Sequence, residues 1–212
     1  MRAWCLSLCL CLCLCLALAA SAHGDVADIS RLESVLADFD HQDLLFDQYV
    51  HDADGQLVEF ASGRFVMARP RFRWMVDDPY PQVIVSNGEW LKIYDADLEQ
   101  VTEKSLTDAL TGTPLGILSQ PRGSLAGEFD VLSHDAASGA TGDEYFLLAP
   151  VAAEVKAQRV EIWLHDARLK RLDVTDEFGG RLRIEFKPAA GLSPLANPFE
   201  LVVPEGTEVI RG

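Results

Sequence analysis

The sequence predicts a mainly antiparallel β protein with a few helices, an α+β fold. Many short segments alternate apolar and polar residues at the period of two that a half-buried strand requires, as Phe72, Trp74 and Val76 show. Turn-forming pairs such as Asn87-Gly88 separate these segments. A long stretch of helical spacing occurs near the start, at residues 25–39. These observations together favour a sheet with helices on one face.

The segments that alternate in this way follow one another along most of the chain and are separated by turn signals. The predicted strands are 43–50, 57–69, 71–76, 83–86, 89–93, 98–102, 129–133, 144–149, 159–165, 169–175, 182–187 and 199–203. Between the second and third strands, Arg69-Pro70 interrupts the ladder, because proline cannot donate a backbone hydrogen bond. A cation is therefore expected at a joint between two strands.

The hairpin around Asn87-Gly88 predicts which residues share a face. A two-residue loop pairs Ser86 with Glu89 and Ile84 with Leu91, and paired residues point to the same side of a sheet. Ile84, Leu91 and Ile93 are therefore expected on one common apolar face.

Two segments are predicted to be helical. The first, 25–39, contains Ser30 and Glu33 at the spacing of a capping box. Its apolar stripe, expected to pack on the sheet, consists of Ile29, Leu32, Val35, Leu36 and Phe39. The second, 105–120, is rich in leucine but is interrupted by glycine and proline, which favours two short helical turns.

The first 22 residues have the pattern of a secretory signal peptide. A positive start precedes a short apolar run, and Ala20-Ser21-Ala22 forms a small-residue cleavage site. The run is shorter than the ~20 residues that a membrane span needs. All five cysteines lie in this segment, so residues 23–212 are expected to form one exported domain without disulfides.

The charge and the motifs exclude several functions. The chain carries 33 acidic against 18 basic side chains, a formal charge of −15, which disfavours nucleic acid as a partner. The histidines lack metal-ligand spacing and no glycine-rich phosphate loop occurs, so neither a metal nor a cofactor is expected. Ser133-His134-Asp135 contains the residue types of a hydrolase triad, but adjacent residues of a strand point to opposite sides. A loop at 51–55 looks faintly like a calcium loop, but it lacks the final glutamate and is expected to be a turn.

Two interpretations of the apolar sheet face remain open from these patterns. The face, covered by a broken apolar segment, is typical of a hydrophobic container. It is also typical of a closed β-sandwich or barrel core, which is the commoner use of such a face.

The sequence resembles a known family. The residues that carry the resemblance are Gly63, Arg69-Pro70, Phe72, Trp74, Val85-Ser86-Asn87-Gly88, Tyr94, Glu99-Gln100-Val101-Thr102 and Thr113-Pro114-Leu115, with Phe46-Asp47-Gln48 before them and Phe199, Val203-Pro204, Gly206 and Val209-Ile210 at the end. This series resembles the LolA family of periplasmic outer-membrane lipoprotein carriers. One departure is Asp95-Ala96-Asp97, where the family often has Asn-Pro-Phe.

The resemblance implies an incomplete antiparallel β-barrel with a helical lid over a hydrophobic cavity. It implies that Arg69 acts as a latch, which holds the lid shut in the empty protein. It places in the acyl-chain cavity Phe72 and Trp74, beside Ile84, Leu91 and Ile93. It assigns to the lid Leu32, Leu36, Phe39, Leu106, Leu110, Leu115, Ile117 and Leu118.

The resemblance also implies a function without covalent chemistry. The expected protein is a monomeric periplasmic chaperone that takes acylated lipoproteins from an ATP-driven (ABC-type) inner-membrane release complex and passes them to an outer-membrane receptor. One alternative is a carrier or sensor of the same shape for a glycolipid or polyisoprenoid. Another is a secreted hydrolase that uses His134 or His165.

Overall fold

The computed structural model describes residues 26–37, 41–106, 114–119, 125–136, 142–151 and 157–211. Its helices are α1 (Val26–Ala37), α3 (Pro114–Ser119) and the 3-10 turn η2 (Leu125–Gly127). Its strands are β1 (Gln42–His51), β2 (Leu57–Ala68), β3 (Arg71–Asp78), β4 (Gln82–Ser86), β5 (Trp90–Asp95), β6 (Gln100–Ser105), β7 (Phe129–Ala136), β8 (Asp143–Pro150), β9 (Ala157–His165), β10 (Arg168–Asp176), β11 (Arg181–Pro188) and β12 (Glu208–Arg211).

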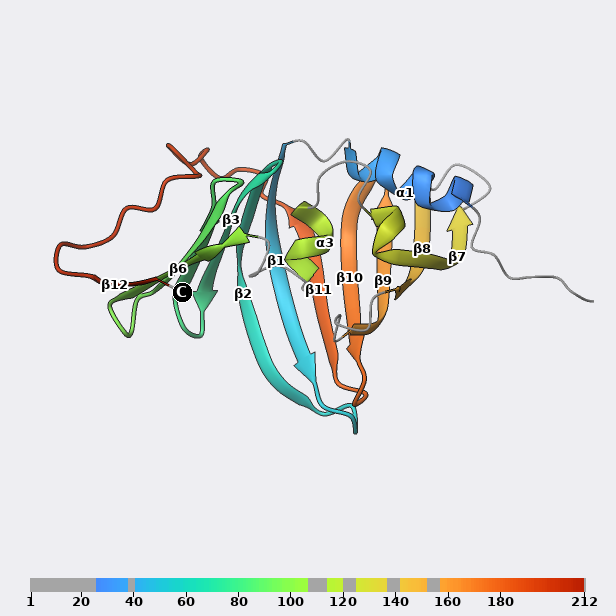
Figure 1. Cartoon of the computed structure of the whole chain (residues 1–212), viewed down its shortest axis with the longest axis horizontal. Coiled ribbons are helices and arrows are strands. Elements are labelled where there is room, and N and C mark those ends of the chain that lie inside the picture. Colours follow the sequence, from blue (N-terminus) through green and yellow to red (C-terminus); the bar gives the residue numbers. More distant parts are fainter. Residues whose placement is uncertain are drawn as a thin grey trace, which may run out of the picture.

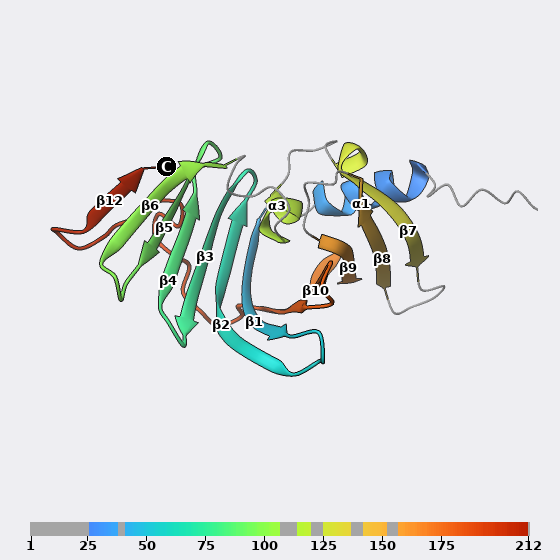
Figure 2. The same ribbon diagram turned by 60° about the horizontal axis from the view of Figure 1, so that its bottom comes forward.

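All twelve strands form one open sheet, with the order β12-β6-β5-β4-β3-β2-β1-β11-β10-β9-β8-β7. The neighbours are antiparallel except β12 and β6, which are parallel. Figures 1 and 2 show that the sheet curves around α1 and α3, with α1 across the ends of β7 to β10 and α3 close to β1 and β11. Because β12 and β7 do not pair with each other, the barrel is incomplete. The predicted α+β class and open barrel are confirmed.

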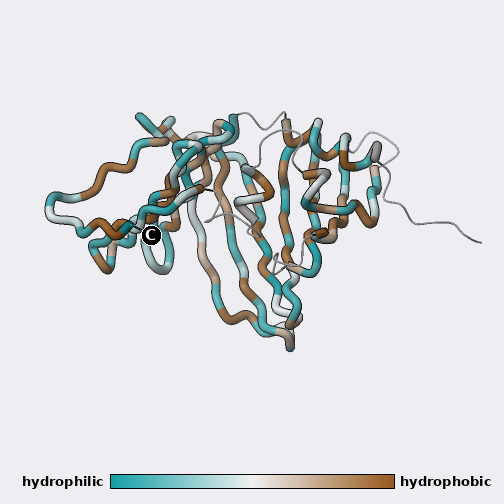
Figure 3. The backbone as a smooth tube through the Cα atoms, in the orientation of Figure 1, coloured by the Kyte–Doolittle hydropathy of each residue, from teal (hydrophilic) through white to brown (hydrophobic). Residues whose placement is uncertain are grey.

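The core lies on the inner face, between the sheet and the helices. Hydrophobic and hydrophilic residues alternate along the strands in Figure 3. In β9, for example, Val160 and Ile162 are fully buried while their neighbours are partly exposed. The predicted stripe of α1 joins the same core through Ile29, Leu32, Val35 and Leu36. The alternation thus explains which face became the core.

Two details of α1 differ from the expectation. The helix begins at Val26, so Ser30 lies inside it and does not cap it. The Glu33 carboxylate instead accepts a hydrogen bond from the Leu125 backbone N–H at 3.1 Å, which ties α1 to η2. Residues 25 and 38–40 of the predicted helix, including Phe39, lie outside the described residues.

The hairpin of β4 and β5 has the predicted faces but another register. Ser86 pairs with Leu91 and Ile84 with Ile93, a shift of two residues from the expected pairing. The Asn87 side-chain oxygen accepts hydrogen bonds from the backbone N–H groups of Glu89 (2.9 Å) and Trp90 (2.8 Å), so Asn87 lies before the turn. A shift of two preserves the side on which each residue lies. Ile84, Leu91 and Ile93 therefore still share a face.

Residues 189–207 form an irregular segment, here called the C-terminal strap, which is held to the outer face of the sheet by arginines. Arg64 donates to the Ser193 carbonyl (3.1 Å), and Arg73 donates to the Pro198 (3.3 Å) and Glu200 (3.1 Å) carbonyls. The predicted strand 199–203 is wrong, because these residues pair with no neighbouring strand and the Glu200 carbonyl accepts a hydrogen bond from Arg73 instead. The strap ends in β12, which the sequence patterns did not predict.

Candidate functional site

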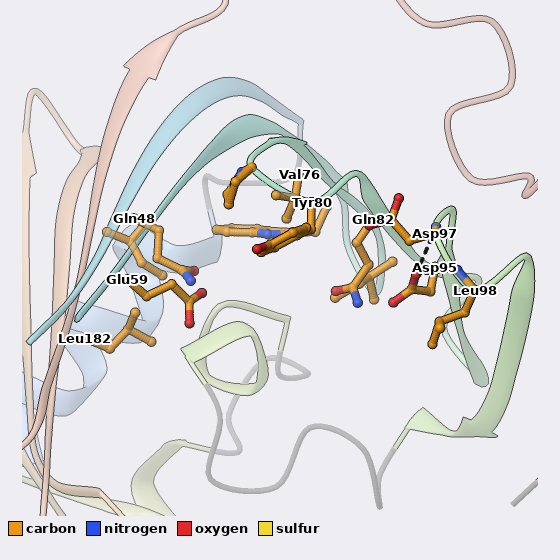
Figure 4. A pocket seen from close by; sticks show the side chains of 13 residues that line it. Gln48, Glu59, Val76, Tyr80, Gln82, Asp95, Asp97, Leu98 and Leu182 are labelled. Carbon is orange, nitrogen blue, oxygen red and sulfur yellow. Dashed lines mark hydrogen bonds between the residues drawn. The ribbon is translucent and has the colours of Figure 1, made fainter.

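A cavity of about 620 Å³ opens on the inner face of the sheet, and Figure 4 shows its side chains. The described residues that line it come from β1 to β5, from β11 and from the turns after β3 and β5. They are Gln48, Glu59, Trp74, Val76, Pro79, Tyr80, Gln82, Ile84, Asp95, Asp97, Leu98, Leu182 and Ile184. This volume lies within the range of about 300–1,000 Å³ that is usual for small-ligand sites.

Aromatic side chains close the inner end of the cavity. Trp74 stacks on Phe46, with ring centroids 3.8 Å apart, and tilts against Phe65 at 5.4 Å. Phe186 contacts the edge of the same indole at 6.4 Å. All four rings are at least 95% buried, so Trp74 forms an apolar floor of the cavity and the three phenylalanines pack around it and hold it rigid.

Gly63 makes the floor possible. A Cβ atom at this position would lie 1.8 Å from the Met75 carbonyl oxygen and 2.9 Å from Phe46 Cζ. The register between β2 and β3 also shifts between Ser62 and Gly63. Only glycine allows the backbone of β3 and the Phe46 ring to approach so closely.

The open end of the cavity has exposed apolar residues among carboxylates. Tyr80 and Leu98 are 72% and 68% exposed. In Figure 4, Glu59 lies on one side of the cavity and Asp95 and Asp97 on the other. The Asp95 carboxylate accepts hydrogen bonds from the backbone N–H groups of Asp97 and Leu98, both at 3.1 Å, and so shapes the turn that forms this rim. The departure noted in the sequence therefore lies at the mouth of the cavity.

The structure divides the predicted cavity residues into two groups. Trp74 and Ile84 line the cavity. Phe72 and Leu91 lie on the same face but in the packed core, and Ile93 packs against that core. An acyl-chain role for these five residues stays a prediction.

Sequence reasoning missed the lining residues that come from outside the meander of β3 to β5. Gln48 of β1 pairs with Ile184 of β11, and Val50 pairs with Leu182. The alternation of Leu182, Ile184 and Phe186 was visible in the sequence. What it did not reveal is that β11 lies beside β1, which brings these residues to the cavity.

The predicted lid residues that the structure describes pack onto the sheet. Leu32 and Leu36 of α1, and Ile117 and Leu118 of α3, are at most 4% exposed, and Leu106 is partly buried against the same core. Leu115 lies in α3, but its side chain is outside the described part. Leu110 and Phe39 also lie outside it.

Polar groups fix α1 to the far end of the sheet. Arg31 donates from Nε to Glu144 at 3.0 Å and from Nη2 to the other oxygen of the same carboxylate. His134 Nδ1 lies 2.8 Å from Asp28 Oδ1, and its ring stacks on Phe146 at 4.2 Å. The hydrogen bond from Arg31 holds the pKa of Glu144 below its ordinary value, against the opposing effect of burial. His134 thus contacts Asp28 of α1, as part of the attachment of this helix.

This attachment predicts a pH-dependent stability. Because the folded pKa of Glu144 is lowered, its contribution is complete at neutral pH and is lost as the pH falls below the ordinary value of 4.5 and through the folded pKa. Glu144→Gln should lower the free energy of unfolding at pH 7 by about 1 kcal/mol, a modest value because Arg31 is partly exposed. The difference from the wild type should shrink toward pH 3.

Urea unfolding at several pH values measures this contribution. Glu205→Gln, on an exposed residue of the C-terminal strap, is the matched control and should change nothing. A constant difference between Glu144→Gln and the wild type from pH 7 to pH 3 would contradict the prediction.

Arg69 lies in the two-residue turn between β2 and β3, as the sequence indicated. The side chain is half-buried, and its Nε and Nη2 atoms are shielded from solvent. Pro70 packs toward the neighbouring turn, where a Cβ added to Gly88 would lie 2.7 Å from Pro70 Cγ. Gly88 also has a positive φ of 97°, so these two turns require glycine at their contact.

Other expected features can be located as well. Asp52 accepts hydrogen bonds from the backbone N–H groups of Asp54 (3.0 Å) and Gln56 (2.8 Å), which confirms that 51–55 is a turn. His165 Nδ1 lies 2.7 Å from Asp143 at an exposed strand end. In the described ranges, His, Cys, Asp and Glu form no group of three suited to a metal ion. Within the same ranges, none of the helices has the length and hydropathy for a membrane span.

The protein has a curved, incomplete barrel, helices on its inner face and an apolar cavity beside them. These features place it in the class of half-barrel proteins. The sequence matches the family described as outer membrane lipoprotein carrier protein LolA over residues 41–199. The chain belongs to this family.

Two relatives agree with this assignment in sequence. An outer-membrane lipoprotein carrier protein of Chromohalobacter salexigens is 32% identical over 193 residues, which is 90% of each chain. One of Alkalilimnicola ehrlichii is 36% identical over 170 residues, covering 78% of this chain and 75% of that protein. Among solved structures, a LolA superfamily protein of Nitrosomonas europaea matches with a TM-score of 0.40 at 14% identity, over 76% of this chain and 94% of its own.

Proposed function

We propose that the chain is a periplasmic chaperone that binds the acyl chains of lipoproteins released from the inner membrane and carries them to an outer-membrane receptor. The observation that carries the proposal is the cavity, which has an aromatic floor and a mouth open to solvent. Burial of a methylene group contributes ~0.8 kcal/mol, so an acyl chain needs only such an apolar surface to bind. The names of the relatives support lipoprotein as the cargo.

The proposal needs no covalent chemistry and no cofactor. His134, the histidine of the possible triad, contacts Asp28 of α1, and His165 contacts Asp143 at the surface. Energy for loading would come from an ABC-type release complex in the inner membrane. The first 22 residues would direct export and be removed, and the domain formed by residues 23–212 would act as a monomer.

Incubation of the purified protein with spheroplasts tests this function. The expected result is an ATP-dependent soluble complex of one lipoprotein with this protein, which does not form when the protein is left out. Absence of the complex, with folded protein and a matched release complex present, would overturn the lipoprotein cargo. An activity that disappears in His134→Ala or His165→Ala would overturn the carrier function in favour of a hydrolase.

We also propose that Arg69 is the latch of the lid. A shielded guanidinium at a turn would offer a rigid set of donors to a lid that closes over it. Contacts of this kind stabilise the closed, empty state, so they favour release of the cargo.

Arg69→Leu should therefore accept lipoprotein normally but deliver it to the receptor about tenfold less, since one hydrogen bond from a charged donor contributes on the order of 1.5 kcal/mol. Transfer from the preloaded complex to the receptor measures this step apart from loading. Arg168→Leu, on an exposed arginine, is the control and should deliver normally. Unchanged delivery by Arg69→Leu would remove Arg69 from the mechanism.

A further inference from the structure

The cavity lies beside the lid helices and not beneath them. Its described lining comes from strands and turns, and none of it from α1 or α3. The buried leucines of α1 pack instead in the closed core, and the polar attachment of α1 is to β7 and β8, at the far side of the sheet. A ligand can therefore enter this cavity while α1 stays attached.

The volume limits what fits. A methylene group is similar in size to a water molecule, which occupies about 30 Å³ in the liquid, so a chain of sixteen carbons requires roughly 500 Å³. The cavity of about 620 Å³ can hold one such chain but is smaller than the roughly 1,000 Å³ that two would require.

The charges at the mouth limit which head group the chain carries. The described lining contains three carboxylates, Glu59, Asp95 and Asp97, and no lysine, arginine or histidine. The whole chain adds a formal charge of −15. An anionic head group at this mouth is repelled, whereas a neutral or cationic one is not.

We propose that this cavity is a subsite for a single acyl chain, that it fills while α1 remains on the sheet, and that it selects acyl chains on neutral or cationic head groups against anionic lipids. The inference rests on the proposed function, because it concerns the same cavity. It gives the carrier a means to reject free fatty acids and anionic phospholipids, whose acyl chains offer the same apolar surface. Further acyl chains of one cargo would require the helices to move.

Titration of the full chain with monopalmitoylglycerol and with palmitate, both below their aggregation limits, tests the selectivity. The neutral lipid should bind about tenfold more tightly than the anionic one, as expected for repulsion between charges at the mouth. Glu59→Gln combined with Asp97→Asn should bring the two affinities together. Asp130→Asn, on an exposed residue of β7, should preserve the difference. Equal affinities in the wild type would overturn the selectivity.

Two further measurements test where the lipid binds and whether the lid helix α1 stays on the sheet. Leu182→Trp fills the cavity and should weaken monopalmitoylglycerol binding about tenfold, whereas Leu132→Trp, at a 61% exposed position, should not. Hydrogen exchange of the α1 amides should not change when monopalmitoylglycerol binds. Loss of their protection, or full affinity in a folded Leu182→Trp variant, would overturn the inference.

The outcomes separate this inference from the proposed function. A protein that forms the lipoprotein complex but does not bind monopalmitoylglycerol would overturn the single-chain subsite and leave the carrier function intact. A protein that binds the neutral lipid in this cavity but forms no lipoprotein complex would overturn the proposed function.

Discussion

Gly63→Ala is expected to lower the free energy of unfolding by about 3 kcal/mol or more, at the upper end of what overpacking costs. The new methyl group would overlap the Met75 carbonyl oxygen, at 1.8 Å, and that oxygen belongs to the backbone of β3. A backbone atom in the middle of a sheet cannot move without breaking ladder hydrogen bonds. The substitution should therefore separate β2 from β3 or displace Phe46 from the cavity floor.

Urea unfolding measures this loss, and Gly127→Ala is its control. Gly127 has no atom within 4 Å of an added Cβ, so its substitution should be close to neutral. If Gly63→Ala unfolds at the wild-type urea concentration, the close approach of β3 and Phe46 is not a requirement of the fold.

Trp74→Ala is expected to cost about 3–5 kcal/mol, the range for removal of a large buried aromatic side chain. Trp74 is 4% exposed and contacts Phe46, Phe65 and Phe186, so its loss removes the centre of the cavity floor. Trp74→Phe retains a ring that can stack on Phe46 and should lose less than half as much. The midpoints of urea unfolding give both values, and equal losses in the two variants would contradict the role of the stacked ring.

Local sequence patterns predicted the faces of the strands but not the register of every pair. Alternation within a segment located most strands, and the common face of Ile84, Leu91 and Ile93 survived a register that differed by two residues. The error came from one side chain, because the Asn87 oxygen bonds to the backbone ahead of it and displaces the turn. Faces follow from the period of two, whereas register depends on such individual contacts.

Features that depend on distant partners could not be predicted from local patterns. β12 pairs with β6, and the contact between Gln100 and Glu208 joins residues 108 positions apart. The cavity likewise depends on the pairing of β1 with β11. The resemblance to a family supplied the open barrel and the lid, since it carries the tertiary arrangement with it. The departure from the family pattern at Asp95-Ala96-Asp97 was visible in the sequence, but its place at the mouth of the cavity was found only in the structure.

Because the chain is made from its N-terminus, β6 is present before β12, with which it pairs in parallel. The two strands can therefore pair only late in folding. Strands β2 to β6 are neighbours in sequence and can pair as soon as they emerge, as can β7 to β11. The free edge of β6 can receive its native neighbour only when residues 208–211 are present. Until residues 208–211 are made, this edge can pair with other chains. Pairing with β12 thus replaces the six-residue edge of β6 by a strand of four residues, and short edge strands offer less backbone for association.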